Sequence, residues 1–166
     1  RLIERMLKVV EGVVADIEAT QKVDPVFVDT AVDFIRFYAD RTHHGKEEDI
    51  LFRDLQQKPL SPEDRRVMEE LVAEHVLGRD TTRALVAANT RYRNGDPAAL
   101  AEIAAHLKTL TEFYPRHIAK EDKAFFPASR AYFTAAEDQA MLAEFWEFDR
   151  QMIHEKYKAI VQALQS

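Results

Sequence analysis

The chain has 166 residues with 46% hydrophobic and 31% charged residues, a length and composition that predict a single globular domain over residues 1–166. Because it contains no cysteine, disulfides, thiolate metal sites and thiol catalysis are excluded, and a cytoplasmic location is expected. The net charge of −6 argues against nucleic acid as a partner, and no apolar run is long enough to predict a membrane span.

Apolar residues recur every three or four positions along most of the chain, which predicts an all-α protein. Three helices are expected to start with an N-cap followed by proline, and the last starts with a capping box from Thr134 to Glu137. Since the connections are short, consecutive helices should form an up-down antiparallel four-helix bundle with an additional C-terminal helix. The five predicted helices cover about residues 1–20, 24–57, 61–94, 96–127 and 134–166.

Two segments on different predicted helices share one polar pattern. Residues 43–52 and 117–126 each begin with His, followed by Lys three positions later and Glu four positions later. On a helix, positions i and i+4 face the same way, so each segment offers an imidazole and a carboxylate to one point. A single copy is more simply a solvated helix face, whereas two aligned copies indicate a site for a carboxylate-bridged metal pair.

Counting along the helices tests whether these residues meet. His43 lies fourteen residues before Gln57, and His75 lies thirteen after Pro62; His75 lies nineteen before Asn94, and His117 lies twenty after Pro97. In antiparallel hairpins these counts place the three histidines at one level. The same counts place His106 about three helical turns from this level and place His154 beyond it.

A ligand from the first helix is expected at this level as well. Counting back from His43 to Pro25 gives eighteen residues, which places the matching position of the first helix at Leu2 or just ahead of Arg1. The first helix therefore looks truncated, with its ligand close to or immediately before Arg1.

This combination of motifs resembles the hemerythrin and HHE cation-binding family over the first four predicted helices. The resemblance implies a centre of two non-haem iron ions inside the bundle. It also implies that Glu47 and Glu121 bridge the two irons, and that a histidine of the first helix is missing ahead of Arg1. The ligands carried over from the family motif are His43, Glu47, His75, His117 and Glu121.

Two positions depart from the oxygen-carrying hemerythrins. These carriers have a second histidine four residues after the one that matches His75, where this chain has Arg79. Arg79 could pair with a bridging carboxylate or an anion at a vacant coordination position, or point past the site to solvent. His44 stands where the hemerythrin-like domain of the iron-sensing F-box protein has an additional carboxylate ligand. It is therefore either a sixth metal ligand or a supporting or surface histidine.

The function implied is binding or sensing of dioxygen, nitric oxide or iron, with a small diatomic molecule as partner. One alternative is a diiron oxidase or peroxidase, and another is a helical interaction module with a structural metal. No histidine follows a glutamate by three residues, the spacing of ferritin-like oxidases, which weakens one branch of the enzyme hypothesis. Whether the chain is an enzyme stays open at this point.

Overall fold

The structure is a computed structural model that describes residues 2–165; Arg1 and Ser166, where the first and last predicted helices begin and end, lie outside this range. Every element within it is helical and no β-strand occurs there, which confirms the predicted all-α class. None of the helices in residues 2–165 is both long and apolar enough to cross a membrane. In chain order the elements are α1 (Leu2–Thr20), α2 (Pro25–Phe34), η1 (Ile35–His44), η2 (Glu47–Phe52), α3 (Arg53–Leu55), α4 (Pro62–Arg93), α5 (Ala99–Lys120), η3 (Glu121–Phe125), α6 (Phe126–Arg130) and α7 (Ala135–Gln165).

Three of the four predicted helix starts are confirmed by their capping bonds. Oδ1 of Asp24 accepts a hydrogen bond from the amide of Val26 at 2.9 Å, and Oγ of Ser61 accepts one from the amide of Asp64 at 3.1 Å. Before α7, the amide of Thr134 donates to the Glu137 carboxylate at 2.8 Å, as a capping box requires. The helix expected to start at Asp96-Pro97 begins instead as α5 at Ala99, because Asp96 accepts from the Ala98 amide in a turn that precedes the helix.

The helix around the motifs departs from the prediction in two ways. The predicted helix over residues 24–57 contains two π-helical stretches, η1 and η2, and the one predicted to end near Pro127 contains a third, η3, and continues as α6 to Arg130. Pro127 does not end the helix; it lies in the first turn of α6, directly after the π-helical stretch η3.

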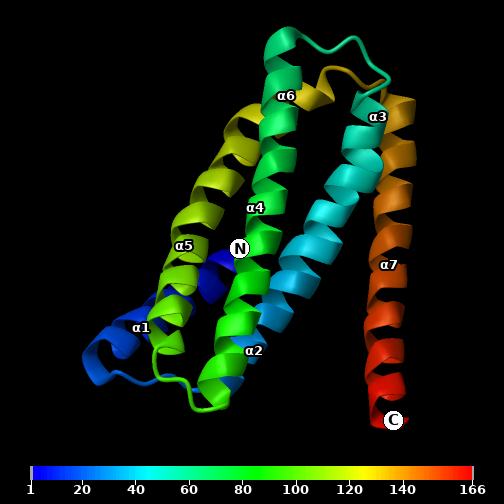
Figure 1. The fold of residues 1–166 in the computed structure, drawn as a ribbon. Coiled ribbons are helices and arrows are strands. Elements are labelled where there is room, and N and C mark those ends of the chain that lie inside the picture. The colour runs from blue at the N-terminus through cyan, green and yellow to red at the C-terminus, as the bar shows by residue number, and fades with distance from the viewer. Residues whose placement is uncertain (1, 166) are drawn as a thin grey trace.

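The long helices pack side by side, as the ribbon shows (Figure 1). α4 contacts both α5 and α2, α1 contacts α5, and α7 contacts η1 and η2. The chain rises through α2 to α3, descends in α4, rises again in α5 and descends in α7 (Figure 1).

Two apolar clusters stabilise this arrangement. One gathers side chains of α1, α2, η1, α4 and α5, with Leu85, Ile103 and Leu107 fully buried in it. The other gathers η2, α3, the first part of α4, η3 and α7 around Phe52, Leu71 and Phe125. Along α4, residue 75 falls between the two clusters, as residue 44 does between Ala39 and Ile50. His117 lies beside Ile118, at the end of the first cluster. A polar layer is thus enclosed between two apolar ones, where its charges are shielded from water.

Candidate metal centre

The π-helical stretches hold four of the six predicted ligand positions. η1 ends with His43 and His44, η2 starts with Glu47 and η3 starts with Glu121. At the end of η1 the amide of Gly45 donates to the carbonyl of Asp40, five residues earlier. Such a turn holds more residues than an α-helical turn, so adjacent side chains diverge by less than about 100°. This wider turn lets the neighbouring His43 and His44 both take part in one polar cluster.

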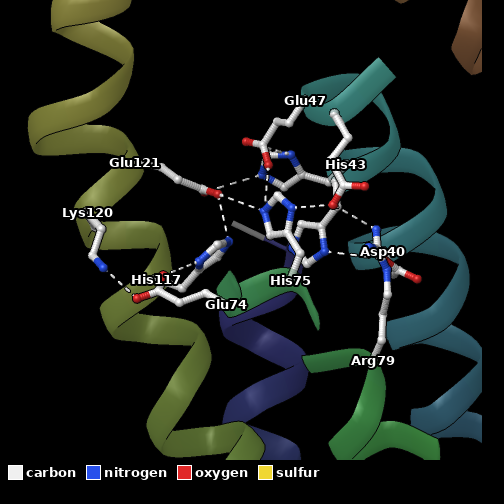
Figure 2. A network of polar contacts seen from close by, with 11 residues as sticks. Asp40, His43, Glu47, Glu74, His75, Arg79, His117, Lys120 and Glu121 are labelled. Atoms are coloured by element: carbon white, nitrogen blue, oxygen red, sulfur yellow. Dashed lines mark hydrogen bonds and ion pairs between the residues drawn. The ribbon is translucent and has the colours of Figure 1, made fainter. Parts of the chain in front are cut away.

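The structure brings all six predicted residues together. Figure 2 shows His43, Glu47, His75, His117 and Glu121 pointing toward one another. His44, Glu47, His75 and His117 form one group of possible metal ligands, and all four are buried. A second group consists of His43, Glu47 and Glu121. Within each group the ligand atoms lie within 4.8 Å of one another, and Glu47 belongs to both groups. His43, His75 and His117 therefore lie at the same level of their three helices, as the residue counts predicted.

Short distances connect the two groups. Nε2 of His117 lies 2.7 Å from Oε1 of Glu121, and Nε2 of His75 lies 3.2 Å from Oε2 of Glu47. Nε2 of His43 lies 3.7 Å from Oε2 of Glu121. The side chain of His43 is 34% exposed whereas that of His75 is fully buried, so the His43 end of the centre is the end that solvent reaches.

The inner atoms of this cluster lack hydrogen-bond partners. Both carboxylate oxygens of Glu47 and of Glu121, and the Nε2 atoms of His75 and His117, are buried without a hydrogen bond in the part of the chain that the structure describes. These atoms face one another at 2.7–4.0 Å, so a proton or a cation is needed between the imidazole nitrogens and the carboxylate oxygens. Leaving one buried polar atom unsatisfied costs about 1–3 kcal/mol. A cation coordinated by these oxygen and nitrogen atoms satisfies them all, and the donor set suits iron, manganese or zinc.

The outer nitrogen of each buried imidazole contacts a carboxylate. Nδ1 of His75 lies 2.6 Å from Glu48, Nδ1 of His117 lies 2.7 Å from Glu74, and Nδ1 of His44 lies 3.3 Å from Asp40. Such a contact favours a proton on Nδ1, orients the ring and directs Nε2 toward a metal.

Two cations in turn hold these three carboxylates (Figure 2). Arg79 donates from Nε to Asp40 at 2.7 Å and from Nη2 to Glu48 at 3.0 Å, whereas Lys120 contacts Glu74. Arg79 therefore pairs neither with Glu47 nor with Glu121, and it does not point past the site to solvent. Instead it fixes the outer carboxylates behind His44 and His75.

The sequence analysis did not predict these outer carboxylates and their cations, although two of the residues stand at helical spacing from a predicted ligand. Asp40 precedes His44 by four residues, and Lys120 follows His117 by three, at helical spacing. Glu48 and Glu74 directly adjoin Glu47 and His75, where a regular α-helix would turn them about 100° away from the site.

The two histidines that the residue counts place away from the site lie outside both groups of possible metal ligands. His106 is half-buried on α5 and His154 is exposed on α7. Tyr114 belongs to the apolar core and also lies near the centre, with its ring stacked 6.3 Å from the ring of His44.

Burial and charge shift the ionisation of the inner groups. Burial would lower the pKa of His75, but the carboxylates of Glu121 and Glu47 raise it to about 9. Burial lowers the pKa of His44 to about 4 in spite of its contact with Asp40. Although burial opposes its ionisation, contacts with His117 and His75 hold the pKa of Glu121 well below its usual range. In a metal-free protein at pH 7 the His75 ring therefore carries a proton that a metal has to displace.

These shifts predict that the metal-free protein is most stable near pH 6.5. The pKa of His75 is raised above its unfolded value of about 6.5, so its contribution is complete below that pH and is lost as the pH rises through 9, by up to about 3 kcal/mol. The pKa of His44 is depressed, so its contribution is present above pH 6.5 and is lost as the pH falls toward 4. Urea unfolding of the metal-free protein at pH 5, 6.5 and 9.5 measures the loss of stability on both sides of this maximum. A free energy of unfolding that increases from pH 6.5 to 9.5 would contradict the assignment for His75.

Three cavities reach residues of the cluster. A cavity of about 590 Å³ reaches His43 and Glu47, and most of its remaining lining is apolar, with one wall formed by Met141, Leu142 and Phe145 of α7. A second cavity of about 480 Å³ reaches His43 between η1 and α7. The smallest, of about 270 Å³, reaches His44 between η1 and α4. The centre is therefore buried but accessible to small molecules.

Comparison with known proteins gives one match. The family profile of the hemerythrin HHE cation binding domain matches residues 1–129, which include all six clustered residues and end before α7. No curated protein and no solved structure matches the chain.

Proposed function

The chain belongs to the hemerythrin HHE cation-binding domain family, and from this we propose that it holds two non-haem iron ions and binds or senses a small diatomic ligand. The observation that carries the proposal is the set of six buried inner atoms without hydrogen-bond partners, contributed by Glu47, His75, His117 and Glu121. Six nitrogen and oxygen donors with two carboxylates exceed what a four-coordinate structural zinc site needs, and they suit a carboxylate-bridged pair.

Each donor group would hold one ion. His44, Glu47, His75 and His117 would hold the first, and His43, Glu47 and Glu121 the second. Glu47 would bridge the ions because it belongs to both groups. Glu121 would be the other bridge, because one of its oxygens lies near His117 and the other near His43. In this assignment His44 is a ligand, since its Nδ1 faces Asp40 and its Nε2 is left for the ion.

The proposed arrangement around the site follows the family. Residues 1–166 would form a single domain, in which α1, the helix from α2 to α3, α4 and the helix from α5 to α6 make an up-down four-helix bundle. α7 lies beyond the matched residues and packs on η1 and η2 as an additional helix.

Iron in such a pair supplies redox chemistry and a coordination position at which dioxygen or nitric oxide can bind. The residues of the chain control access to it. The 590 Å³ cavity provides an apolar path for an uncharged diatomic molecule to the exposed side of His43. Phe52 and Phe113 stack against the rings of His75 and His117 and keep water from the inner side of the cluster.

An absorption spectrum tests this function. Ferrous protein mixed anaerobically with nitric oxide, or with air, is expected to develop new visible bands, and Glu121→Ala treated in the same way is not. Bands that appear with air and reverse under argon would indicate a carrier or sensor. A wild-type protein that holds iron but gives no spectral change with either gas would contradict the proposed ligand class.

An oxidase or peroxidase remains the second candidate because of the size of the apolar cavity. A volume of about 590 Å³ far exceeds the space that a diatomic molecule needs and lies within the range of small-molecule sites. An enzyme of this kind would consume dioxygen or peroxide steadily in the presence of an organic reductant, whereas a carrier or sensor would take up one equivalent and stop. Oxygen-electrode traces with a phenolic or thiol reductant separate the two.

A further inference from the structure

The smallest of the three cavities that reach the cluster differs from the others in the charge of its lining. It measures about 270 Å³ and lies between η1 and α4, with the buried side chains of His44 and Tyr114 at its inner end. Four of its lining residues are arginines: Arg36 and Arg41 from η1, and Arg79 and Arg83 from α4. Asp40 is the only acidic side chain among the lining residues. In a chain with a net charge of −6, this concentration of positive charge around one cavity points to an anionic ligand.

Three of these arginines are exposed at the rim and available to a ligand. Arg36 makes no ion pair with any residue in the described range 2–165. Arg41 pairs with Glu155, and Arg83 with Asp80, but both pairs are largely exposed, with at least half of each side chain accessible to solvent. Exposed pairs of this kind contribute about 0–1 kcal/mol, so an anion in the cavity can compete for both guanidinium groups.

We propose that this cavity binds a small oxyanion, a carboxylate or a tetrahedral anion such as a phosphate group, with Arg36 as its principal anchor. The planar guanidinium group presents paired N–H donors that match two oxygens of such an anion. The volume accommodates an anion of a few heavy atoms together with water. Anion binding involves no metal, so this proposal can be tested independently of the proposed iron function.

Arg79 connects this cavity to the metal centre. It lines the cavity and donates to Asp40 and Glu48, which contact the outer nitrogens of His44 and His75. An anion that draws the guanidinium group of Arg79 toward itself weakens its hold on these two carboxylates. Where iron is bound, the anion is therefore expected to shift the visible spectrum of the centre without adding a ligand to it.

Calorimetric titration of the full chain tests the proposal. Sulfate and acetate serve as probes for the tetrahedral and the carboxylate anion, at an ionic strength held constant with sodium chloride, because chloride lacks paired oxygens. Saturable binding of at least one probe to the wild-type chain is expected, and the tighter probe identifies the ligand class. Arg36→Ala should weaken it about tenfold or more, since hydrogen bonds to charged groups contribute about 1.5–3 kcal/mol and 1.4 kcal/mol is tenfold.

Two further variants separate a site from general charge screening. Arg65→Ala removes the same charge from an exposed position of α4 that does not line the cavity, and it should bind the probe as the wild type does. Arg36→Lys keeps the charge but loses the paired donors, so an affinity between those of the wild type and Arg36→Ala is expected. Non-saturable heats in the wild type, or equal affinities in Arg36→Ala and Arg65→Ala, would overturn the proposal. The iron content of Arg36→Ala should equal that of the wild type, so a failure of the iron function would appear separately.

Discussion

Replacing Glu121 by alanine is expected to lower the iron content of the reconstituted protein from two ions to fewer than one per chain. Glu121 is fully buried, and its carboxylate lies within 4 Å of His43, His75 and His117. A carboxylate shared between two ions neutralises charge on both, so its loss leaves Glu47 as the only carboxylate of the two donor groups to balance both cations. Glu47→Ala should have a similar effect because Glu47 belongs to both donor groups.

The controls for this experiment come from the same chain. His106→Ala and His154→Ala each remove a histidine that lies outside both donor groups, and both variants should keep two irons per chain. Glu121→Gln retains the shape of the side chain without its charge, so it should lose iron while keeping the helical circular dichroism of the wild type. Equal iron contents in Glu47→Ala, Glu121→Ala and the two histidine variants would show that the site lies elsewhere.

Removal of the metal is expected to lower the melting temperature by roughly 8–16 °C. Without a metal the six inner atoms stay buried, with the contacts of a protonated His75 to Glu47 and Glu121 in place of coordination to a cation. A ligand present at about 1,000 times its dissociation constant stabilises the folded state by about 4 kcal/mol. For a chain of this length, 1 kcal/mol changes the melting temperature by about 2–4 °C.

Thermal unfolding with and without a chelator measures this shift at a fixed pH. Glu121→Ala provides the matched control, because a variant that holds little iron should melt at the same temperature in both conditions. Identical melting temperatures of the loaded and the chelator-treated wild type would mean that the cluster contributes nothing to stability through a metal.

Much of the fold could be predicted because its signals are local. The N-caps at Asp24 and Ser61 and the capping box at Thr134 each involve residues only two or three positions apart. The convergence of His43, His75 and His117 followed from helix lengths alone, since short connections fix the relative heights of neighbouring helices.

The remaining features depend on tertiary contacts that no local pattern encodes. The π-helical turns that let His43 and His44 share one cluster cannot be read from apolar spacing, which assumes about 3.6 residues per turn. The pairing of Arg79 with Asp40 and Glu48 joins α4 to η1 and η2 across more than thirty residues of sequence. The apolar cavity at His43 needs α7, whose position depends on packing against η1 and η2.

The close approach of α7 depends on one small residue. A Cβ atom at Gly45 would lie 2.8 Å from the ring of Phe148 on α7, closer than real Cβ contacts allow. The glycine between η1 and η2 therefore sets how near α7 can come to the metal centre.

The iron content of the wild-type chain tests the central claim most directly. Protein reconstituted anaerobically with ferrous iron, freed of excess metal and analysed for iron and protein on the same sample should contain two irons per chain, one for each donor group around Glu47. A value of one would show that only one donor group holds an ion, and would contradict the paired site. A value of zero in a fully folded sample would contradict metal binding by this cluster altogether.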